Sequence, residues 1–533
     1  MTETMTGAQA AVAQLAAEGV EVILGIPGIH TLHLCDAVLD YPQIRFVTGR
    51  HEQGSVFMAN GYARASGRIA VPIVITGPGV TNSLTALADA YADSVPMVLI
   101  AAKLEQGLAG KGAFHELKDQ TQLLASVTKW NRRVERAEEV PEAIRQAFAQ
   151  AYAGRPGPAA VEIPLDVQAG RGGVEIYPRP LPERQKADPS AVVEAARRLR
   201  EASRPLVFAG GGAVAAGCRA ELMELMERLQ APSFTTVLAK GLIPEDHELH
   251  LGSTWSKGGP IQEMIESADV VLVVGSSLDE AGTGLWTLDL PENLIQIDMA
   301  PQVIGRNYPV AVSLVGDAKV VLAQLLEELE GIGEVDRGAL IDRIARSRTR
   351  EFEETKDEIG WAYMEAMQEV LPRDAFVTND ASGANGWAVR YLDRYLPRTM
   401  NITSNMGALG YAIPGAIGAK LAYPERQAVA VIGDGGFLFT AHCLATAVQH
   451  RLNAVVVVFD DGCYSTVKSR QIRDFGRSIG VDLQNPDFVR LAEAYGAGAG
   501  RAKSPEELSS LLTAAWARDV PTVIEVPLRK GEC

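Results

Sequence analysis

Two aspartates stand where a pair of carboxylates could bind a divalent cation. Asp434 lies in the sequence Gly-Asp-Gly-Gly (433–436), after the apolar run 428–432, and Asp461 follows the next apolar run, 454–459. Because the carboxyl ends of neighbouring parallel strands meet at one edge of a sheet, both carboxylates are predicted to lie there. Two such oxygens with a backbone carbonyl suit Mg²⁺ when diphosphate oxygens and a water complete its octahedron. The alternative is a glycine turn in which Asp434 caps a helix, but the paired Asp461 favours the metal site.

Glu52 is the second residue that could do chemistry. It lies in Arg-His-Glu-Gln-Gly (50–54), directly after an apolar strand pattern and at the start of a helical pattern. A carboxylate in the first turn of a helix is favoured by the helix dipole, so a purely structural role is the alternative to catalysis. The helix that follows is rich in alanine and glycine (Ala59, Gly61, Ala63, Ala65), which predicts close packing against a neighbour.

Two further glycine-rich segments could surround a ligand. Residues 75–82 (ITGPGVTN) have the pattern of a strand, a glycine turn and a helix. Residues 404–410 (SNMGALG) precede a helical segment that is dense in small residues. Such segments let a flat ligand approach the backbone, although each could also be only a tight turn.

These residues have to be positioned by an α/β framework that occurs three times. Apolar runs of strand length alternate with helical patterns, which predicts doubly wound parallel sheets. The predicted domains are residues 1–170, 190–330 and 358–533, joined by a linker rich in proline, glycine and charge at 171–190 and a charged helical linker at 331–358. The predicted core strands include 20–25, 44–48, 71–76, 97–101, 206–212, 270–276, 294–298, 375–379, 428–432, 454–460 and 522–526.

Composition excludes several classes of protein. The chain has 533 residues and a formal net charge of −16, with 47% hydrophobic and 22% charged residues, which is typical of a multidomain globular protein. The acidity argues against a nucleic acid or an anionic membrane as the main partner. The five cysteines have no zinc-binding spacing, and we find neither a signal peptide nor a transmembrane run, so we expect reduced thiols and a cytoplasmic protein.

In combination, the motifs resemble the thiamine-diphosphate enzymes of the acetolactate synthase and 2-oxo-acid decarboxylase group. The resemblance covers essentially the whole chain, from MTGAQA and GIPG through RHEQGSVFMANGYAR, ITGPGVTNSLTALADAYADSVPM and KGLIPEDH to the paired GDGG and DDG. It implies a pyrimidine-binding domain, a central Rossmann-like domain and a diphosphate-binding domain, in that order.

The resemblance also implies roles for individual residues. Glu52 matches the glutamate that forms a hydrogen bond with N1′ of the aminopyrimidine and so promotes formation of the C2 ylid. Leu409 matches the bulky residue that keeps the cofactor bent, although core packing is the alternative. Asp434, Asp461 and the Cys463 carbonyl match the Mg²⁺ ligands. The other predicted cofactor contacts are Pro27, Gly28, Thr76, Asn82, Ala381, Ser382, Gly383, Gly407, Gly433, Gly435, Gly436, Tyr464 and Ser465.

The sequence departs from this family at two places. The second metal position is usually asparagine and here is Asp461, whose extra charge should bind the cation more tightly but repel a diphosphate. The middle domain lacks the segments associated with FAD in biosynthetic acetolactate synthases, so FAD is not expected. The glycines at 210–212 are interpreted as a turn.

The phrases PGIHTLHL, GAFHELKDQ and IGVDLQNPDF are most similar to the branch that contains 2-ketoarginine decarboxylase. This predicts decarboxylation of a 2-oxo acid through an enamine, with acetolactate-synthase-like carboligation as the alternative and a non-catalytic binding protein as a third hypothesis. His115 and His30 are candidate catalytic residues, each with a structural role as the alternative. Gln120 and Lys468, with Tyr464 and Ser465, are candidate pocket residues. The acid that would pair with a guanidino group is not identified.

Glu52 and Asp434 fall in different predicted domains, so a cofactor has to bridge them. In this family the bridge forms between two subunits, which implies a homodimer or homotetramer.

Overall fold

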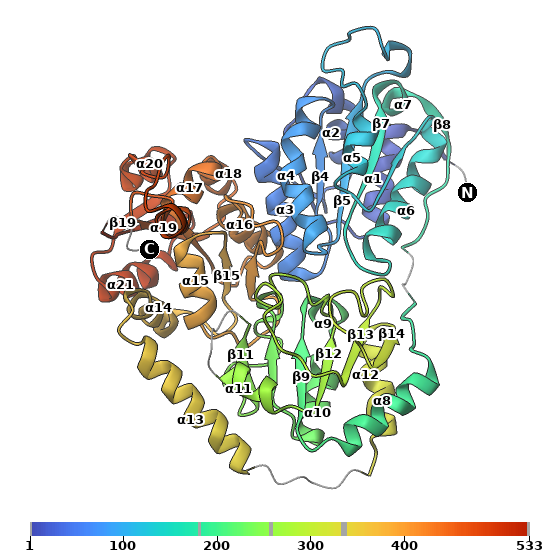
Figure 1. Cartoon of the computed structure of the whole chain (residues 1–533). Coiled ribbons are helices and arrows are strands. Elements are labelled where there is room, and N and C mark those ends of the chain that lie inside the picture. The colour runs from blue at the N-terminus through green and yellow to red at the C-terminus, as the bar shows by residue number, and fades with distance from the viewer. Residues whose placement is uncertain (1–2, 180–182, 255–259, 332–337, 530–533) are drawn as a thin grey trace.

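The computed structural model describes residues 3–179, 183–254, 260–331 and 338–529 of the chain. Three α/β domains surround a common centre, with the N-terminal domain in blue and cyan, the central domain in green and yellow, and the C-terminal domain in orange and red (Figure 1). Each contains a six-stranded sheet whose neighbouring strands are all parallel. The predicted fold class is confirmed.

The N-terminal sheet has the strand order β3-β2-β4-β5-β7-β6. Its strands are β2 (Val22–Gly25), β3 (Arg45–Thr48), β4 (Val71–Val74), β5 (Met97–Lys103), β6 (Trp130–Arg133) and β7 (Pro158–Pro164). The helices are α1 (Gly7–Ala17), α2 (Leu32–Val38), α3 (Glu52–Ser66), α4 (Pro78–Ala92), α5 (Gln120–Ala125), α6 (Val140–Tyr152) and α7 (Leu165–Ala169). The four loops that follow β2, β3, β4 and β5 therefore meet at one edge, because these strands are parallel neighbours.

The segment 171–190 differs from the linker expected there. Its first residues form β8 (Arg171–Val174), which pairs antiparallel with β1 (Glu3–Thr6), and its last residues begin α8 (Pro189–Glu201). The sequence signal was weak because two glycines occupy β8, and glycine is uncommon in strands. Residues 180–182 lie outside the described residues.

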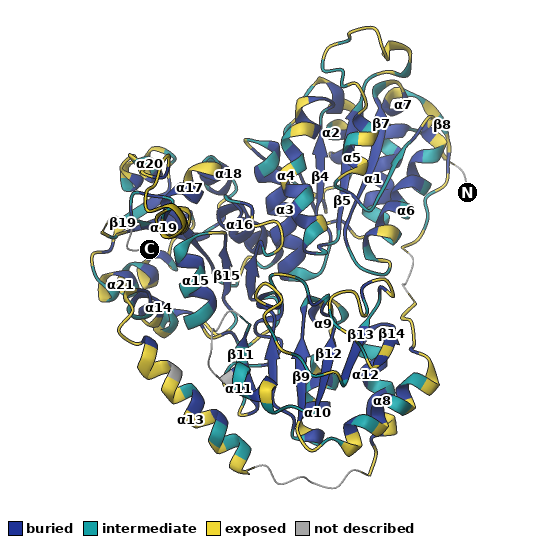
Figure 2. Cartoon of the chain, viewed as in Figure 1, coloured by how far each residue is buried: buried dark blue, intermediate teal, exposed yellow. Residues whose placement is uncertain are grey.

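The central sheet has the strand order β11-β10-β9-β12-β13-β14. Its strands are β9 (Pro205–Ala209), β10 (Ser233–Thr235), β11 (His250–Ser253), β12 (Val270–Val274), β13 (Leu294–Asp298) and β14 (Val312–Val315), and its helices are α9 (Gly211–Ala216), α10 (Arg219–Leu229), α11 (Pro260–Ser267) and α12 (Ala318–Glu328). The charged segment expected to be helical contains α13 (Gly338–Thr355), which lies along the outside of the molecule with many exposed residues (Figure 2).

The C-terminal sheet has the strand order β16-β15-β17-β18-β20-β19. Its strands are β15 (Phe376–Asn379), β16 (Met400–Ile402), β17 (Ala428–Gly433), β18 (Val455–Asp460), β19 (Gly498–Arg501) and β20 (Thr522–Pro527). The helices are α14 (Ile359–Val370), α15 (Gly383–Tyr391), α16 (Ala412–Ala422), α17 (Asp434–Thr440), α18 (Cys443–Gln449), α19 (Ser465–Phe475), α20 (Phe488–Ala494) and α21 (Pro505–Ala515). All six residues of β17 are buried, as expected for a strand covered by helices on both faces.

Helices α3 and α16 join the N-terminal and C-terminal domains. A Cβ at Gly61 would lie 2.4 Å from the carbonyl oxygen of Gly415, and one at Gly418 would lie 2.1 Å from that of Met58. Only glycine allows the two backbones to approach so closely. The close packing predicted for α3 is therefore made against α16, the helix that follows the loop 404–410.

Among the residues that the structure describes, no helix is long and apolar enough to cross a membrane. The four described cysteines, Cys35, Cys218, Cys443 and Cys463, are free thiols, and Cys533 lies outside the described residues.

Candidate functional site

Glu52 is the first residue of α3 and its side chain faces the start of α4. His51 precedes it in extended conformation and caps the helix, since its Nδ1 accepts a hydrogen bond of 3.2 Å from the Gln53 amide. Glu52 is 8% exposed. Its Oε2 accepts a hydrogen bond of 2.9 Å from Nδ2 of Asn82. The two residues predicted to contact the same cofactor are therefore in direct contact with each other.

The turn after β4 closes this edge of the N-terminal sheet. The Thr76 hydroxyl donates to Oε1 of Gln120 at 2.8 Å, and the Gly77 amide donates to the same oxygen at 3.2 Å. A Cβ at Gly28 would lie 2.7 Å from the Ile75 side chain, so the Pro27–Gly28 turn packs on this segment. Gln120 thus holds the turn and is 2% exposed, which gives the candidate pocket residue a structural role.

The two candidate catalytic histidines come together at the same edge. The ring centroids of His30 and His115 are 5.5 Å apart, and the Phe114 ring stacks on His115 at 3.7 Å. His115 has a positive φ of 68°, and its carbonyl oxygen would lie 2.5 Å from a Cβ at Gly77. Burial, and then the neighbouring His115, lower the pKa of His30 below its ordinary value. His30 is therefore held in the neutral form near pH 7.

The two predicted metal ligands follow adjacent parallel strands of the C-terminal sheet. Residues 433 and 459 are register partners, so Asp434 at the start of α17 meets Asp460, the last residue of β18, and the following Asp461 at one edge. Asp434 and Asp461 are each 3% exposed. Burial, and then the charges of Asp461 and Asp460, raise the pKa of Asp434 to about 6. Such a crowded set of carboxylates is stabilised by a cation, so the donor chemistry fits Mg²⁺.

Asn485 is a site residue that sequence reasoning missed. Its Nδ2 donates to Oδ2 of Asp434 at 2.6 Å and to Oδ1 of Asp460 at 2.8 Å. In the described part of the chain, no group of three or more histidine, cysteine, aspartate or glutamate side chains is arranged to hold a metal. The predicted set has only two side-chain ligands and the Cys463 carbonyl, so a bound diphosphate would have to complete it.

The turns after β15, β17 and β18 pack on one another around the predicted diphosphate contacts. A Cβ at Gly435 would lie 2.3 Å from the Tyr464 ring, and one at Gly433 would lie 3.1 Å from the Ser382 Cβ. Ser382 caps α15 by accepting from the Asn385 amide at 3.2 Å. The structure therefore brings together the following predicted residues of this edge: Ala381, Ser382, Gly383, Gly433, Asp434, Gly435, Gly436, Asp461, Cys463, Tyr464 and Ser465.

Asp380 is a second residue that the sequence did not single out. It is fully buried, its Oδ2 accepts from the Gly410 amide at 2.6 Å, and burial raises its pKa to about 7. A Cβ at Gly436 would lie 3.1 Å from its Oδ1. Asp380 thus joins the diphosphate turn to the segment that carries Gly407 and Leu409, of which Gly407 is exposed and Leu409 half-buried.

The predicted residues form two sets, one at the edge of the N-terminal sheet and one at the edge of the C-terminal sheet. No hydrogen bond or ion pair among the described residues joins a member of one set to a member of the other. The predicted site residues thus lie at the edges of two different sheets.

Family models match all three domains. The N-terminal TPP (thiamine pyrophosphate) binding domain of thiamine pyrophosphate enzymes matches residues 5–123, the central domain matches 192–325, and the C-terminal TPP binding domain matches 380–526. The chain belongs to the thiamine pyrophosphate enzymes.

Relatives of this thiamine pyrophosphate enzyme match over nearly its whole length. A probable 2-ketoarginine decarboxylase of Pseudomonas aeruginosa is 38% identical, with 98% of this chain and 94% of that protein covered. A probable acetolactate synthase large subunit of Methanocaldococcus jannaschii is 34% identical over 99% of this chain and 93% of its own length. Acetolactate synthase isozyme 3 large subunit of Escherichia coli is 32% identical over 96% and 92%.

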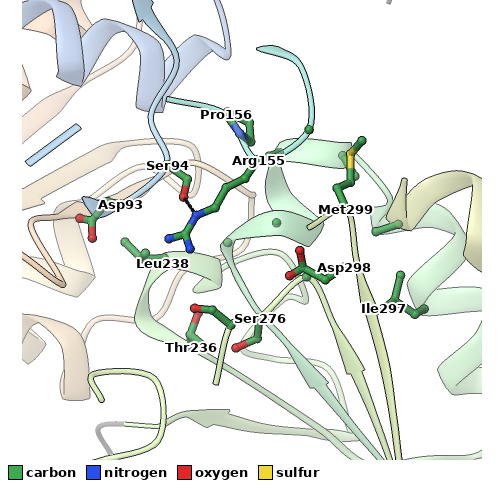
Figure 3. Close-up of a pocket in the computed structure, with 18 of the residues that line it drawn as sticks. Asp93, Ser94, Arg155, Pro156, Thr236, Leu238, Ser276, Ile297, Asp298 and Met299 are labelled. Carbon is green, nitrogen blue, oxygen red and sulfur yellow. Dashed lines mark hydrogen bonds between the residues drawn. The ribbon is translucent and has the colours of Figure 1, made fainter. Parts of the chain in front are cut away.

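This thiamine pyrophosphate enzyme also has a cavity of about 320 Å³ between its three domains (Figure 3). It lies at the carboxyl edge of the central sheet, and none of the residues predicted to bind the cofactor lines it. A Cβ at Gly210 would lie 2.5 Å from the Gly275 carbonyl oxygen, and one at Gly212 would lie 2.9 Å from the Gly275 Cα. These glycines are explained by close contact between the start of α9 and the turn after β12, while the absence of FAD stays a prediction.

Proposed function

We propose that the chain is a Mg²⁺-dependent thiamine diphosphate enzyme that decarboxylates a 2-oxo acid, with 2-ketoarginine as the first substrate to test. The observation that carries the proposal is the 38% identity, over 98% of the chain, to a protein named as a probable 2-ketoarginine decarboxylase. When bound, thiamine diphosphate supplies a nucleophilic carbon and accepts the electron pair released with CO₂.

Glu52 would hold a proton at the N1′ atom of the cofactor's aminopyrimidine. The 8% exposure of Glu52 and its hydrogen bond from Asn82 support this role, because a carboxyl group in such a place is fixed in orientation and shielded from water. Asp434, Asp461 and the Cys463 carbonyl would hold the Mg²⁺ ion, with Asn485 orienting Asp434.

His30 and His115 would act on the 2-oxo acid. Their rings are neighbours, and the neutral His30 ring can donate a hydrogen bond to a substrate oxygen without adding a charge to the pocket. A histidine beside the reacting carbon can also deliver the proton that replaces CO₂ and gives the aldehyde product.

Carboligation is the second candidate. The observation that favours it is the name acetolactate synthase among the relatives, including the 34% identical protein of Methanocaldococcus jannaschii. The two reactions share the loss of CO₂ and differ in whether a proton or a second carbonyl compound is added at the same carbon.

Product analysis separates these candidates. The protein would be incubated with cofactor, Mg²⁺ and either 2-ketoarginine or pyruvate, and CO₂, aldehyde and acetolactate would be measured. Aldehyde as the main product from 2-ketoarginine supports the proposal, whereas acetolactate from pyruvate as the main product refutes it. A Glu52→Gln variant should lose at least about 100-fold in kcat, and unchanged turnover would contradict the role of Glu52.

We further propose that the cofactor binds between two copies of the chain. The N-terminal edge exposes Ile29 (67%) and Phe114 (71%), and the C-terminal domain exposes Phe475 (75%) and Ile479 (84%). Apolar side chains this exposed in both domains that carry predicted site residues are typical of surfaces that a second subunit covers.

Mixing two inactive variants tests this arrangement. A dimer of one Glu52→Gln chain and one Asp434→Ala chain has two sites. If the sites are shared between the chains, one site carries both substitutions and the other carries neither, so activity should return. If each chain builds its own site, every site keeps one defect and the mixture stays inactive after subunit exchange.

A further inference from the structure

The loop from Ser404 to Gly410 is held at both ends by buried carboxylates, and these come from two different domains. The loop connects β16 to α16, and its middle residues, Asn405, Met406 and Gly407, are exposed. At its end the Gly410 amide donates to Oδ2 of Asp380, and the Thr440 hydroxyl donates to the Gly410 carbonyl oxygen at 2.7 Å. Leu409, which the family resemblance predicts to keep the cofactor bent, directly precedes this anchor.

At the start of the loop the anchor is Asp93, which follows α4 in the N-terminal domain. Its carboxylate accepts from the backbone amides of Ser404 and Asn405, both at 2.9 Å, and from Nδ2 of Asn405 at 3.1 Å. The side chain is 0% exposed. Figure 3 shows Asp93 at the edge of the three-domain cavity, beside the ribbon of the C-terminal domain and away from Asp298.

The same carboxylate is paired with a buried arginine. Arg64 donates to Oδ2 of Asp93 at 2.9 Å and to Oδ2 of Asp89 at 3.2 Å. Asp89 also accepts from Nδ2 of Asn60, but no hydrogen bond between Asp89 and the loop 404–410 occurs among the described residues. Both aspartates form ion pairs with Arg64, and Asp93 in addition binds the backbone of the loop.

We infer that Asp93 is a positioning residue, which fixes the loop 404–410 of the C-terminal domain from the N-terminal domain and so sets the place of Leu409 under the cofactor. The Asp93 carboxylate accepts three hydrogen bonds from the consecutive residues Ser404 and Asn405. These charged hydrogen bonds fix the orientation of the backbone at both residues. An amide in place of this carboxylate has a single oxygen, which can accept from Ser404 or from Asn405 but not from both residues, while its NH₂ faces the remaining donor, so the loop start loses its fixed conformation. The link to Leu409 rests on the proposed function, whereas the link to the loop does not.

Amide hydrogen exchange on the full chain without cofactor tests the first link. In Asp93→Asn the amides of Ser404 and Asn405 should exchange at least about tenfold faster than in the parent. The matched control is Asp89→Asn, which also removes a carboxylate from Arg64 but leaves the loop contacts in place, so these two amides should keep their parental rates. Equal rates in Asp93→Asn and the parent, or equal acceleration in both variants, would overturn the inference.

Steady-state kinetics of the loaded enzyme test the second link. Asp93→Asn should lower kcat about tenfold with little change in KM for the 2-oxo acid, because the cofactor is bound but its reacting atoms are misaligned. Asp89→Asn should keep the parental kcat. A parental kcat in Asp93→Asn would refute the role for Leu409 even where the exchange data support the anchor, and failure of the proposed function alone would leave the exchange result unaffected.

A second variant covers the case in which Asp93→Asn does not fold. Asn405→Ala changes an exposed residue, keeps the Arg64 ion pairs and removes one of the three donors. It should accelerate exchange of the Ser404 and Asn405 amides by a smaller factor than Asp93→Asn, about threefold. Parental exchange rates in this variant would contradict the anchor independently.

Discussion

Replacing Asp380 by asparagine is expected to change how the stability of the protein depends on pH. Asp380 is fully buried directly after β15, and its Oδ1 has no hydrogen-bond partner among the described residues. Burial raises its pKa from an ordinary value of 3.8 to about 7, although the amides of Gly410, Ala412 and Tyr411 oppose the rise. The folded protein therefore keeps a proton on Asp380 at pH values where the unfolded chain has lost it.

The sign and the size follow from these two pKa values. Because the folded state binds the extra proton, the stability that Asp380 contributes is greatest below about pH 4 and falls as the pH rises through 7. The difference of about three between the pKa values corresponds to ~4 kcal/mol, of which about 3 kcal/mol is lost between pH 5 and pH 8. Asparagine resembles the protonated side chain and can still accept from the Gly410 amide, so the variant does not undergo this loss.

Differential scanning calorimetry of the cofactor-free chain measures the effect. The Tm of Asp380→Asn minus that of the parent should rise by roughly 6–12 °C from pH 5 to pH 8, at about 2–4 °C per kcal/mol for a domain of this size. Asp519→Asn, whose side chain is 69% exposed in the parent, is the control and should show a constant difference. A difference between Asp380→Asn and the parent that stays the same at both pH values would refute the reasoning.

Three further substitutions, one of them with a control substitution, test other contacts. Asn485→Ala removes the amide that orients Asp434, and should raise the Mg²⁺ concentration for half-maximal activity about 10- to 100-fold. Glu116→Ala removes the acceptor of three backbone amides in the loop before it, and should raise KM for the 2-oxo acid several-fold while exchange of amides 110–113 accelerates. Gly418→Ala forces a Cβ to within 2.1 Å of a backbone oxygen and should lower the free energy of unfolding by about 1–3 kcal/mol. The control is Gly386→Ala, because a Cβ at Gly386 would have no atom within 4 Å. In thermal unfolding this control should be neutral or stabilising.

Each of these results has a contradicting outcome. An unchanged Mg²⁺ requirement would remove Asn485 from the site. An unchanged KM would mean that the loop before Glu116 does not position the substrate. Equal Tm values for the two glycine variants would show that α3 and α16 separate without loss of stability.

The parts of the site that lie on regular elements could be predicted from the sequence. The apolar runs before Asp434 and Asp461 mark strands, and parallel strands in the same sheet necessarily bring their carboxyl ends to one edge. Glu52 was placed at the start of a helix by the same reasoning, and the structure begins α3 at this residue. In each case the signal is local, because the strand, the turn and the functional residue are consecutive in the chain.

The residues that were missed depend on contacts between distant segments. Asn485 lies in a stretch without periodicity after α19, so nothing in the sequence shows that it returns to Asp434. Asp93 and Ser404 are 311 positions apart, and their contact requires two domains to be docked first. His30 and His115 were each predicted separately, but the contact of their rings depends on how the loop after β5 folds back over Gly77.

The crowding of carboxylates at the C-terminal edge has a consequence for the order of binding. Asp434 has its pKa raised to about 6 by burial and by Asp461 and Asp460, so a proton and a divalent cation compete for it. Mg²⁺ affinity should therefore rise about tenfold per pH unit below pH 6 and level off above it. A diphosphate that arrives first would add negative charge to the same carboxylates, so the cation should bind before the cofactor or with it. Calorimetric titration at pH 5, 6 and 7.5 measures both effects: affinity for Mg²⁺ that is independent of pH, or tight binding of the cofactor in the presence of EDTA, would contradict this account of the charge at the site.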